Sequence, residues 1–148
     1  MICVASTGFA SLRTAGTQLL RLPTVLDARG SLVWGETGAH LPFSPRRFWC
    51  IYDVPPGQTR GNHGHRVLHE VLICLRGGCT VILDDGADRD EVVLDAADVG
   101  LHIPPLIWNT QHLFSPDAVL LVLASEVYRA EDYIRDYDEF LTLVAQPN

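Results

Sequence analysis

The segment from Gly57 to Gly77 contains two histidines and a glutamate whose spacing could serve proton transfer or metal binding. In a β-strand, residues i and i+2 point to the same face, so His63 and His65 would project side by side. If the next strand runs back antiparallel, Glu70 can face the same cavity. Two imidazoles and a carboxylate that converge in the mouth of a barrel suit either metal coordination or proton transfer.

The simpler interpretation of an isolated His-x-His pair is two solvent-facing strand residues. Three features favour a functional site instead. The pair lies between Arg60 and Glu70, it follows a glycine-rich turn, and the strand after it is apolar enough to be buried. Placing such polar groups on an inward face costs desolvation, which is tolerated mainly where the site is used.

Short apolar runs, separated by Gly, Pro and Asp, make up most of the chain after Gln18. The runs predicted to be strands are 19–22, 32–34, 47–54, 70–75, 80–83, 91–94, 101–103 and 119–124. Many short strands without intervening helices predict a β-sandwich or small barrel. One amphipathic helix is expected over 131–144, with the acids Asp132, Asp136 and Glu139 on its polar side.

Length and charge set limits on the class of protein. The 148 residues predict a loose N-terminal arm at 1–16 and a single domain at 17–148. Eleven basic residues, all of them arginine, against eighteen acidic residues give a net charge of −7, so no nucleic acid or membrane partner is expected. The lack of lysine excludes Schiff-base catalysis and the phosphate-loop lysine. No Cys-x-x-Cys pair, secretory signal or transmembrane-length run is found, so a reduced cytoplasmic location is expected.

The spacing Gly-x5-His-x-His-x4-Glu-x6-Gly resembles the first sequence motif of the cupin superfamily, which is a small jelly-roll barrel. The second cupin motif would place a glycine and a histidine after the proline, whereas residues 104–109 read Pro-Pro-Leu-Ile-Trp-Asn. The usual fourth metal ligand is therefore missing, since asparagine is a poor ligand for transition metals. The resemblance implies an all-β, cupin-type jelly-roll barrel with one C-terminal amphipathic helix.

Fragments over about residues 22–141 resemble, in order, the dTDP-4-keto-6-deoxyglucose 3,4-ketoisomerases (sugar 3,4-oxoisomerases) of deoxysugar biosynthesis. The fragments lie at 27–32, 60–65, 81–86, 107–108, 114–115, 122–125 and 132–138. The resemblance implies an enzyme without metal or other cofactor, usually a homodimer with exchanged N-terminal strands. Its expected substrate is a dTDP-linked keto-deoxysugar, whose keto group moves from C4 to C3 through an enediolate.

This reaction needs a base with a pKa near neutrality, a second group that relays protons, and a partner for the oxyanion. By resemblance, His65 is the expected base at C3 and His63 assists transfer at C4. Arg60 is expected to hold the enediolate or the diphosphate, and a purely structural role for it remains equally open. The further residues expected to bind the substrate are Arg29, Arg47, Trp49, Glu70, Trp108 and Asn109.

The sequence departs from the family pattern at Glu70, at Asn109, and at Trp49 and Cys50, which stand where tyrosines are expected near Arg47. Glu70 replaces the usual glutamine, and Asn109 replaces a common histidine. Glu70 restores a possible three-ligand metal site with His63 and His65, while Asn109 removes a possible proton relay. Either change could alter the product stereochemistry or the substrate. Two other functions therefore remain open: a metal-dependent cupin enzyme that uses this triad, and a non-catalytic module that binds sugar nucleotides.

Overall fold

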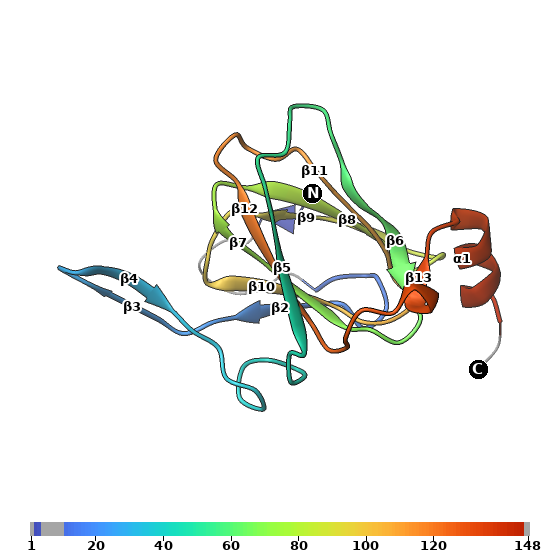
Figure 1. Ribbon diagram of the computed structural model, residues 1–148, viewed down its shortest axis with the longest axis horizontal. Helices are drawn as coiled ribbons and strands as arrows, with labels where there is room; N and C mark the ends of the chain where they lie inside the picture. Colours follow the sequence, from blue (N-terminus) through green and yellow to red (C-terminus); the bar gives the residue numbers. More distant parts are fainter. Residues whose placement is uncertain (1, 4–10, 147–148) are drawn as a thin grey trace.

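Two antiparallel β-sheets face each other in the structure, a computed structural model that describes residues 2–3 and 11–146 (Figure 1). The first sheet has the order β1 (Ile2–Cys3), β9 (Arg89–Leu94), β8 (Cys79–Asp84), β11 (Trp108–His112), β6 (Arg60–His65) and β13 (Tyr133–Ile134), with β1 parallel to β9. The second has the order β2 (Gln18–Arg21), β10 (Val99–Ile103), β7 (Glu70–Arg76), β12 (Val119–Ala124) and β5 (Arg47–Tyr52). Within the described residues no strand pairing joins these two sheets, so the barrel is open.

The core fills the space between the two sheets. Alternate residues of β7, β8 and β12 point inward and are fully buried, as a strand period of two requires. The inward residues of these strands are Leu72, Cys74, Val81, Leu83, Leu120 and Val122. The predicted all-β architecture with a single C-terminal helix is confirmed.

The strand β6 carries the histidines and connects the two sheets. It pairs with β11 in the first sheet, and residues 66–69 then lead the chain into β7 of the second sheet. Glu70, the first residue of β7, therefore faces the barrel interior opposite His63 and His65. Gly61 has a φ of +76°, and a Cβ there would come within 2.9 Å of the backbone oxygen of Asn109, so glycine lets β6 approach β11.

The C-terminal segment differs from its prediction. Instead of one helix over 131–144, the chain forms a 3₁₀ turn (Ala130–Asp132), the strand β13 and a shorter helix α1 (Tyr137–Val144). Asp136 caps α1 by accepting a hydrogen bond from the Glu139 backbone N–H at 2.8 Å. Tyr133 and Ile134 match a helical period by spacing alone. In the structure they pair with His65 and Gly64 of β6 and cover its free edge.

The expected loose arm is anchored where it is described. The backbone N–H groups of Arg13 and Thr14 and the Thr14 hydroxyl donate to Oδ2 of Asp90 at 2.8–2.9 Å. Thr14 is buried, so these residues are fixed rather than loose. Residues 1 and 4–10 of the predicted arm lie outside the described residues. The domain boundary at residue 17 stays a prediction.

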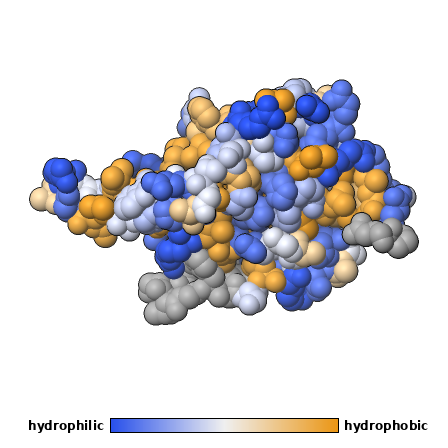
Figure 2. Space-filling model, turned by 90° about the horizontal axis from the view of Figure 1, so that it is seen from below, coloured by the Kyte–Doolittle hydropathy of each residue, from blue (hydrophilic) through white to orange (hydrophobic). Residues whose placement is uncertain are grey.

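A two-stranded hairpin of β3 (Thr24–Asp27) and β4 (Gly30–Val33) projects from the barrel (Figure 1). Its strands are almost entirely exposed, including the apolar side chains of Leu26 and Leu32 at 75% and 60% (Figure 2). A two-stranded hairpin that packs against no other element is only marginally stable on its own. Among the described helices, none has the length and apolar content needed to cross a membrane.

Candidate active site

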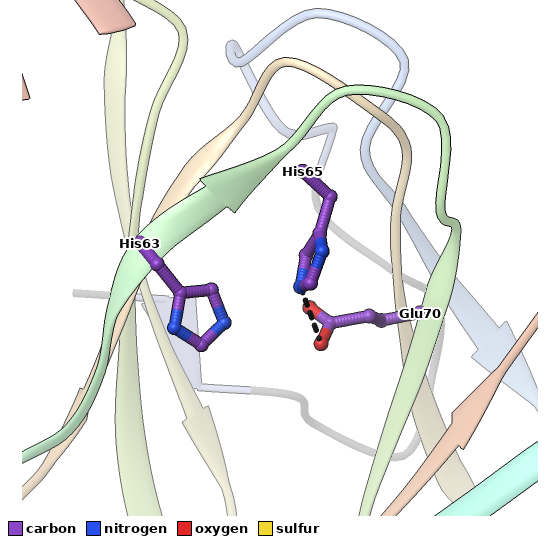
Figure 3. A group of neighbouring side chains, drawn as sticks. All are labelled: His63, His65 and Glu70. Carbon is purple, nitrogen blue, oxygen red and sulfur yellow. Dashed lines mark ion pairs between the residues drawn. The ribbon is translucent and has the colours of Figure 1, made fainter. Parts of the chain in front are cut away.

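His63, His65 and Glu70 meet inside the barrel, as their spacing predicts (Figure 3). The three candidate ligand atoms lie within 4.8 Å of one another, and Nε2 of His65 is 3.4 Å from Oε1 of Glu70. The two imidazole rings are 4.9 Å apart at their centroids and nearly perpendicular. His65 and Glu70 are 3% and 2% exposed, whereas His63 is half-buried. The sequence thus brings two basic groups and one carboxylate to a single site.

Asp132 completes this group and was missed in the sequence. Its Oδ2 lies 3.0 Å from Nδ1 of His65, while its Oδ1 accepts hydrogen bonds from the backbone N–H groups of Arg66 and Val67. A carboxylate accepts, so Nδ1 of His65 carries the hydrogen and the neutral ring has its lone pair on Nε2, toward Glu70. Asp132 is therefore a positioning residue for His65. Its assignment to the polar face of a helix concealed this role.

Tyr133 packs over both imidazoles. Its ring centroid lies 5.1 Å from that of His63 and 4.4 Å from that of His65. The Tyr133 hydroxyl accepts a hydrogen bond from Nη2 of Arg47 at 3.2 Å. Arg135 also packs on this tyrosine, with its guanidinium carbon 4.4 Å from the Tyr133 ring centroid. Tyr133 and Arg135 were also missed, because both fall in the segment predicted to be helical.

A cavity of about 280 Å³ opens beside His63. Its wall contains Trp49, Arg60, Glu70, Gln111, Tyr133 and Arg135, together with Gly61, Ile51, Thr59 and Val122. His65 is not part of this wall but lies directly behind it, against Glu70 and Tyr133. Three larger hollows, of about 510–620 Å³, contain neither His63 nor His65. The cavity beside His63 is therefore the candidate active site, although the other three are larger.

Two predicted substrate contacts do not reach this cavity. Trp108 faces the outside of the barrel and packs against Tyr137 and Phe140 of α1, because its neighbour Asn109 takes the inward position on β11. Trp108 does not line this cavity, and its contact with the substrate stays a prediction. Arg29 lies in the turn of the projecting hairpin, ion-paired with Asp27 at 2.6 Å, and does not reach the cavity of its own chain.

The remaining predicted residues surround the site in different ways. Asn109 is fully buried, and its side-chain N–H group donates to Oε2 of Glu70 at 3.3 Å. Arg47 lies behind the cavity wall with its guanidinium carbon 4.6 Å from the Trp49 ring centroid and 5.3 Å from that of Tyr128. Its Nε atom is buried without a hydrogen-bond partner among the described residues. Arg47 thus keeps donor capacity beside the cavity.

Burial lowers the pKa of His63 below its usual 6.5, because the charged imidazolium loses solvation. The nearby His65 and Arg135 lower it further. The negative charge of Glu70 acts in the opposite direction and raises the pKa of His63. His63 is therefore held as a neutral imidazole over a wider pH range than an exposed histidine.

The same donors could hold a metal ion. Two imidazoles and one carboxylate are a common catalytic ligand set, and a second carboxylate on the far nitrogen of a ligating histidine, as Asp132 provides, is typical of such sites. A metal on His65 would occupy the Nε2 lone pair. Metal coordination and proton abstraction by His65 therefore exclude each other.

An open jelly-roll that holds a histidine pair and a carboxylate between its sheets is the architecture of a cupin. Residues 15–145 match the family described as "FdtA: WxcM-like, C-terminal", and the chain belongs to this family.

Characterised relatives are similar over most of their length. The TDP-4-oxo-6-deoxy-alpha-D-glucose-3,4-oxoisomerase of Aneurinibacillus thermoaerophilus is 44% identical over 131 residues, which is 88% of this chain and 94% of that protein. The structure of a 3,4-ketoisomerase from Helicobacter canadensis matches with a TM-score of 0.85 and 40% identity, covering 88% of this chain and 98% of that one. A variant of QdtA from Thermoanaerobacterium thermosaccharolyticum, in complex with TDP-4-keto-6-deoxyglucose, matches with a TM-score of 0.86 and 36% identity, covering 88% and 94%.

The electrostatic account of His63 predicts the direction of a pKa change. In Glu70→Gln, the pKa of His63 should fall further below its already lowered value, since the neighbouring anion that favours the imidazolium is gone. NMR titration of the His63 ring protons measures this, with Glu91→Gln on β9 as the control for a distant acid. A rise of the His63 pKa in Glu70→Gln would contradict the account.

Proposed function

We infer that the protein is a sugar-nucleotide ketoisomerase, which moves the keto group of a TDP-linked 4-keto-6-deoxyhexose from C4 to C3. The observation that carries this function is the pair His63 and His65 beside a cavity in a cupin barrel. The 44% identity to a TDP-4-oxo-6-deoxyglucose 3,4-oxoisomerase supports the substrate class. Two adjacent imidazoles provide the two proton-transfer groups that a 1,2-shift of a carbonyl requires.

The reaction begins with removal of the hydrogen at C3, which the C4 carbonyl acidifies. The C–H electron pair forms the C3–C4 double bond, and the carbonyl electrons move to O4 as an enediolate. Transfer of the hydroxyl proton from O3 to O4, followed by protonation of C4, gives the 3-keto product. Each hydrogen removed is replaced, so no redox cofactor enters the balance.

His65 remains our proposed base, with Nε2 as the basic atom. Asp132 holds the Nδ1–H tautomer, and the imidazolium formed after proton abstraction would lie between Asp132 and Glu70. His63, on the cavity wall, would deliver the proton to C4. Arg60 has no ion-pair partner among the described residues and also lines the cavity, so it is our proposed partner for the enediolate.

The proposed division between the histidines can be tested by isotope exchange. With TDP-4-keto-6-deoxyglucose in deuterated buffer, His65→Asn should lose deuterium uptake at C3 and reduce turnover by about 100-fold or more. His63→Asn should retain exchange at C3 while product formation slows, because only the return of a proton to C4 is impaired. NMR identifies the labelled position and the product.

The control for this experiment is His112→Asn, a histidine on the outward face of β11, which should leave both rates unchanged. Exchange at C3 that persists in His65→Asn and disappears in His63→Asn would reverse the two assignments. Full activity in the double variant would overturn the mechanism.

A metal-dependent reaction is the second candidate, because the three ligand atoms lie within 4.8 Å. We expect turnover to be unaffected by a chelator, since the proposed base needs the Nε2 lone pair that a metal would occupy. Elemental analysis of the purified protein should find far less than one transition metal per chain. A stoichiometric metal whose removal stops turnover would favour the metal-dependent function. Tight binding of TDP-sugars without any turnover would instead favour the non-catalytic module.

We also propose that the protein is a homodimer in which the β3–β4 hairpin packs on the partner subunit. The hairpin exposes Leu26 and Leu32, and the strand β5 at the edge of the second sheet exposes Phe48 and Tyr52. Exposed apolar side chains beside a free strand edge are typical of an interface. If each subunit places its hairpin on the other, Arg29 reaches the partner's cavity, where the predicted diphosphate contact becomes possible. The cytoplasm stays our proposed compartment.

Mixed dimers test whether Arg29 of one subunit completes the active site of the other. Chains carrying Arg29→Ala and His65→Asn, co-expressed with different tags, should form a mixed dimer with about half the activity of the unmodified dimer, since one of its two sites is intact. Each variant alone should be far less active. A mixed dimer no more active than its parents would contradict the exchange.

The dimer itself is tested by sedimentation. Leu26→Asp should shift the mass toward a single chain, whereas Leu113→Asp, at a comparably exposed leucine outside the hairpin, should not. A single-chain mass for the unmodified protein would reject the dimer.

A further inference from the structure

A chain of three buried polar side chains runs from Glu70 through Asn109 to Gln111, and both ends belong to residues of the cavity wall. The Nδ2 group of Asn109 donates to Oε2 of Glu70 at 3.3 Å, and the Nε2 group of Gln111 donates to Oδ1 of Asn109. Glu70, Asn109 and Gln111 are 2%, 0% and 4% exposed, so each must find its partners within the barrel or in a bound molecule. Asn109 and Gln111 are two residues apart on β11 and share its inward face.

The carboxylate of Glu70 fixes the direction of this chain. An ionised carboxylate only accepts hydrogen bonds, so Asn109 turns its NH₂ group toward Glu70 and its carbonyl oxygen toward Gln111. Gln111 must then turn its own NH₂ group toward Asn109, which leaves its Oε1 at the free end. A glutamine at position 70 would impose no direction, because an amide can donate or accept.

The free end of the chain lies at the cavity. Oε1 of Gln111 is buried without a hydrogen-bond partner among the described residues, and Gln111 is part of the cavity wall. Gly61 of β6 packs against the same amide, since a Cβ there would lie 3.0 Å from Nε2 of Gln111. The Gln111 side chain is thus held from two sides and presents an acceptor that needs a donor.

We propose that Gln111 is a specificity-determining residue, whose Oε1 accepts a hydrogen bond from a hydroxyl group of the sugar bound in the cavity. The proposal rests on the ketoisomerase function. The sugar ring of TDP-4-keto-6-deoxyglucose has two hydroxyls, at C2 and C3, and a ketone at C4. A ketone oxygen has no hydrogen to donate, so an acceptor of fixed direction selects a hydroxyl at its position.

The strand next to β11 provides complementary chemistry. Arg60 lies across from Gln111 in the pairing of β6 with β11, and a guanidinium only donates hydrogen bonds. A donor that suits the keto oxygen therefore lies beside an acceptor that suits a hydroxyl. This pair would bind the sugar with its ketone toward Arg60 and disfavour the reversed orientation.

The test measures binding of deoxy analogues. In a His65→Asn background, which prevents turnover, dissociation constants are measured for TDP, for TDP-4-keto-6-deoxyglucose, and for the analogues without the C2 or the C3 hydroxyl. With Gln111 present, loss of one of these hydroxyls should weaken binding by about 10- to 100-fold, because the buried acceptor is left unpaired. In Gln111→Met, which has similar length but no acceptor, that penalty should disappear, and TDP should bind both proteins equally.

Two further variants make the test specific. Thr110→Val, at the outward-facing neighbour on β11, should keep the hydroxyl penalty. Glu70→Gln should reduce it, since the amide chain can then reverse. A penalty that persists in Gln111→Met, or that vanishes equally in Thr110→Val, would overturn the proposal. Turnover by the unmodified protein is measured separately, so a failure of the proposed function is recognised on its own.

Discussion

The hydrogen bond between Asp132 and His65 links the fold of this protein to its chemistry. Asp132 precedes β13, and its Oδ1 accepts hydrogen bonds from two backbone N–H groups of the loop that follows β6. The carboxylate therefore fixes the loop between β6 and β7 through two backbone hydrogen bonds. It also sets the tautomer of His65 at the end of β6. Together with the pairing of β13 and β6, this contact fixes the segment that carries Tyr133 over the two imidazoles. The C-terminal segment thus builds one side of the site.

The apolar strands could be predicted from the sequence because burial imposes their pattern. The runs at 70–75 and 119–124 correspond closely to β7 and β12, which lie in the middle of a sheet with partners on both sides. The strands β3 and β11 were missed, since one is exposed and the other is mostly polar. In β11, the polar residues point inward to serve the site rather than the core. Functional demands there override the usual alternation of apolar and polar residues.

The candidate site could be predicted in part for a related reason. The spacing of His63, His65 and Glu70 is local, so strand periodicity sufficed to bring them together. Asp132 and Arg135 are distant in the sequence, and only the pairing of β13 with β6 brings them near. No local pattern distinguishes that short strand from a helix.

The departures from the family pattern at Glu70 and Asn109 prove to be one feature. Glu70 and Asn109 are in direct contact, and a carboxylate beside an asparagine amide is a complementary pair. A histidine in place of Asn109 would give Glu70 a titratable neighbour. The asparagine instead provides a neutral donor, which is consistent with our proposal that His63 and His65 transfer the protons. The change therefore removes one proton carrier while it fixes the direction of the hydrogen bonds that lead to Gln111.

Several arginines lie around the cavity, although the protein as a whole is negatively charged. With a net charge of −7, the protein would need positive charge concentrated at the site that we propose for a nucleoside diphosphate. Arg47 and Arg135 are held against aromatic rings, which orient a guanidinium without neutralising it. Arg66, outside the cavity, is instead paired with the carboxylate of Glu139. Aromatic contacts thus preserve the cationic character of Arg47 and Arg135, whereas an ion pair neutralises Arg66. Trp49 and Tyr133 therefore hold two arginines in place beside the cavity that we propose binds the nucleoside diphosphate.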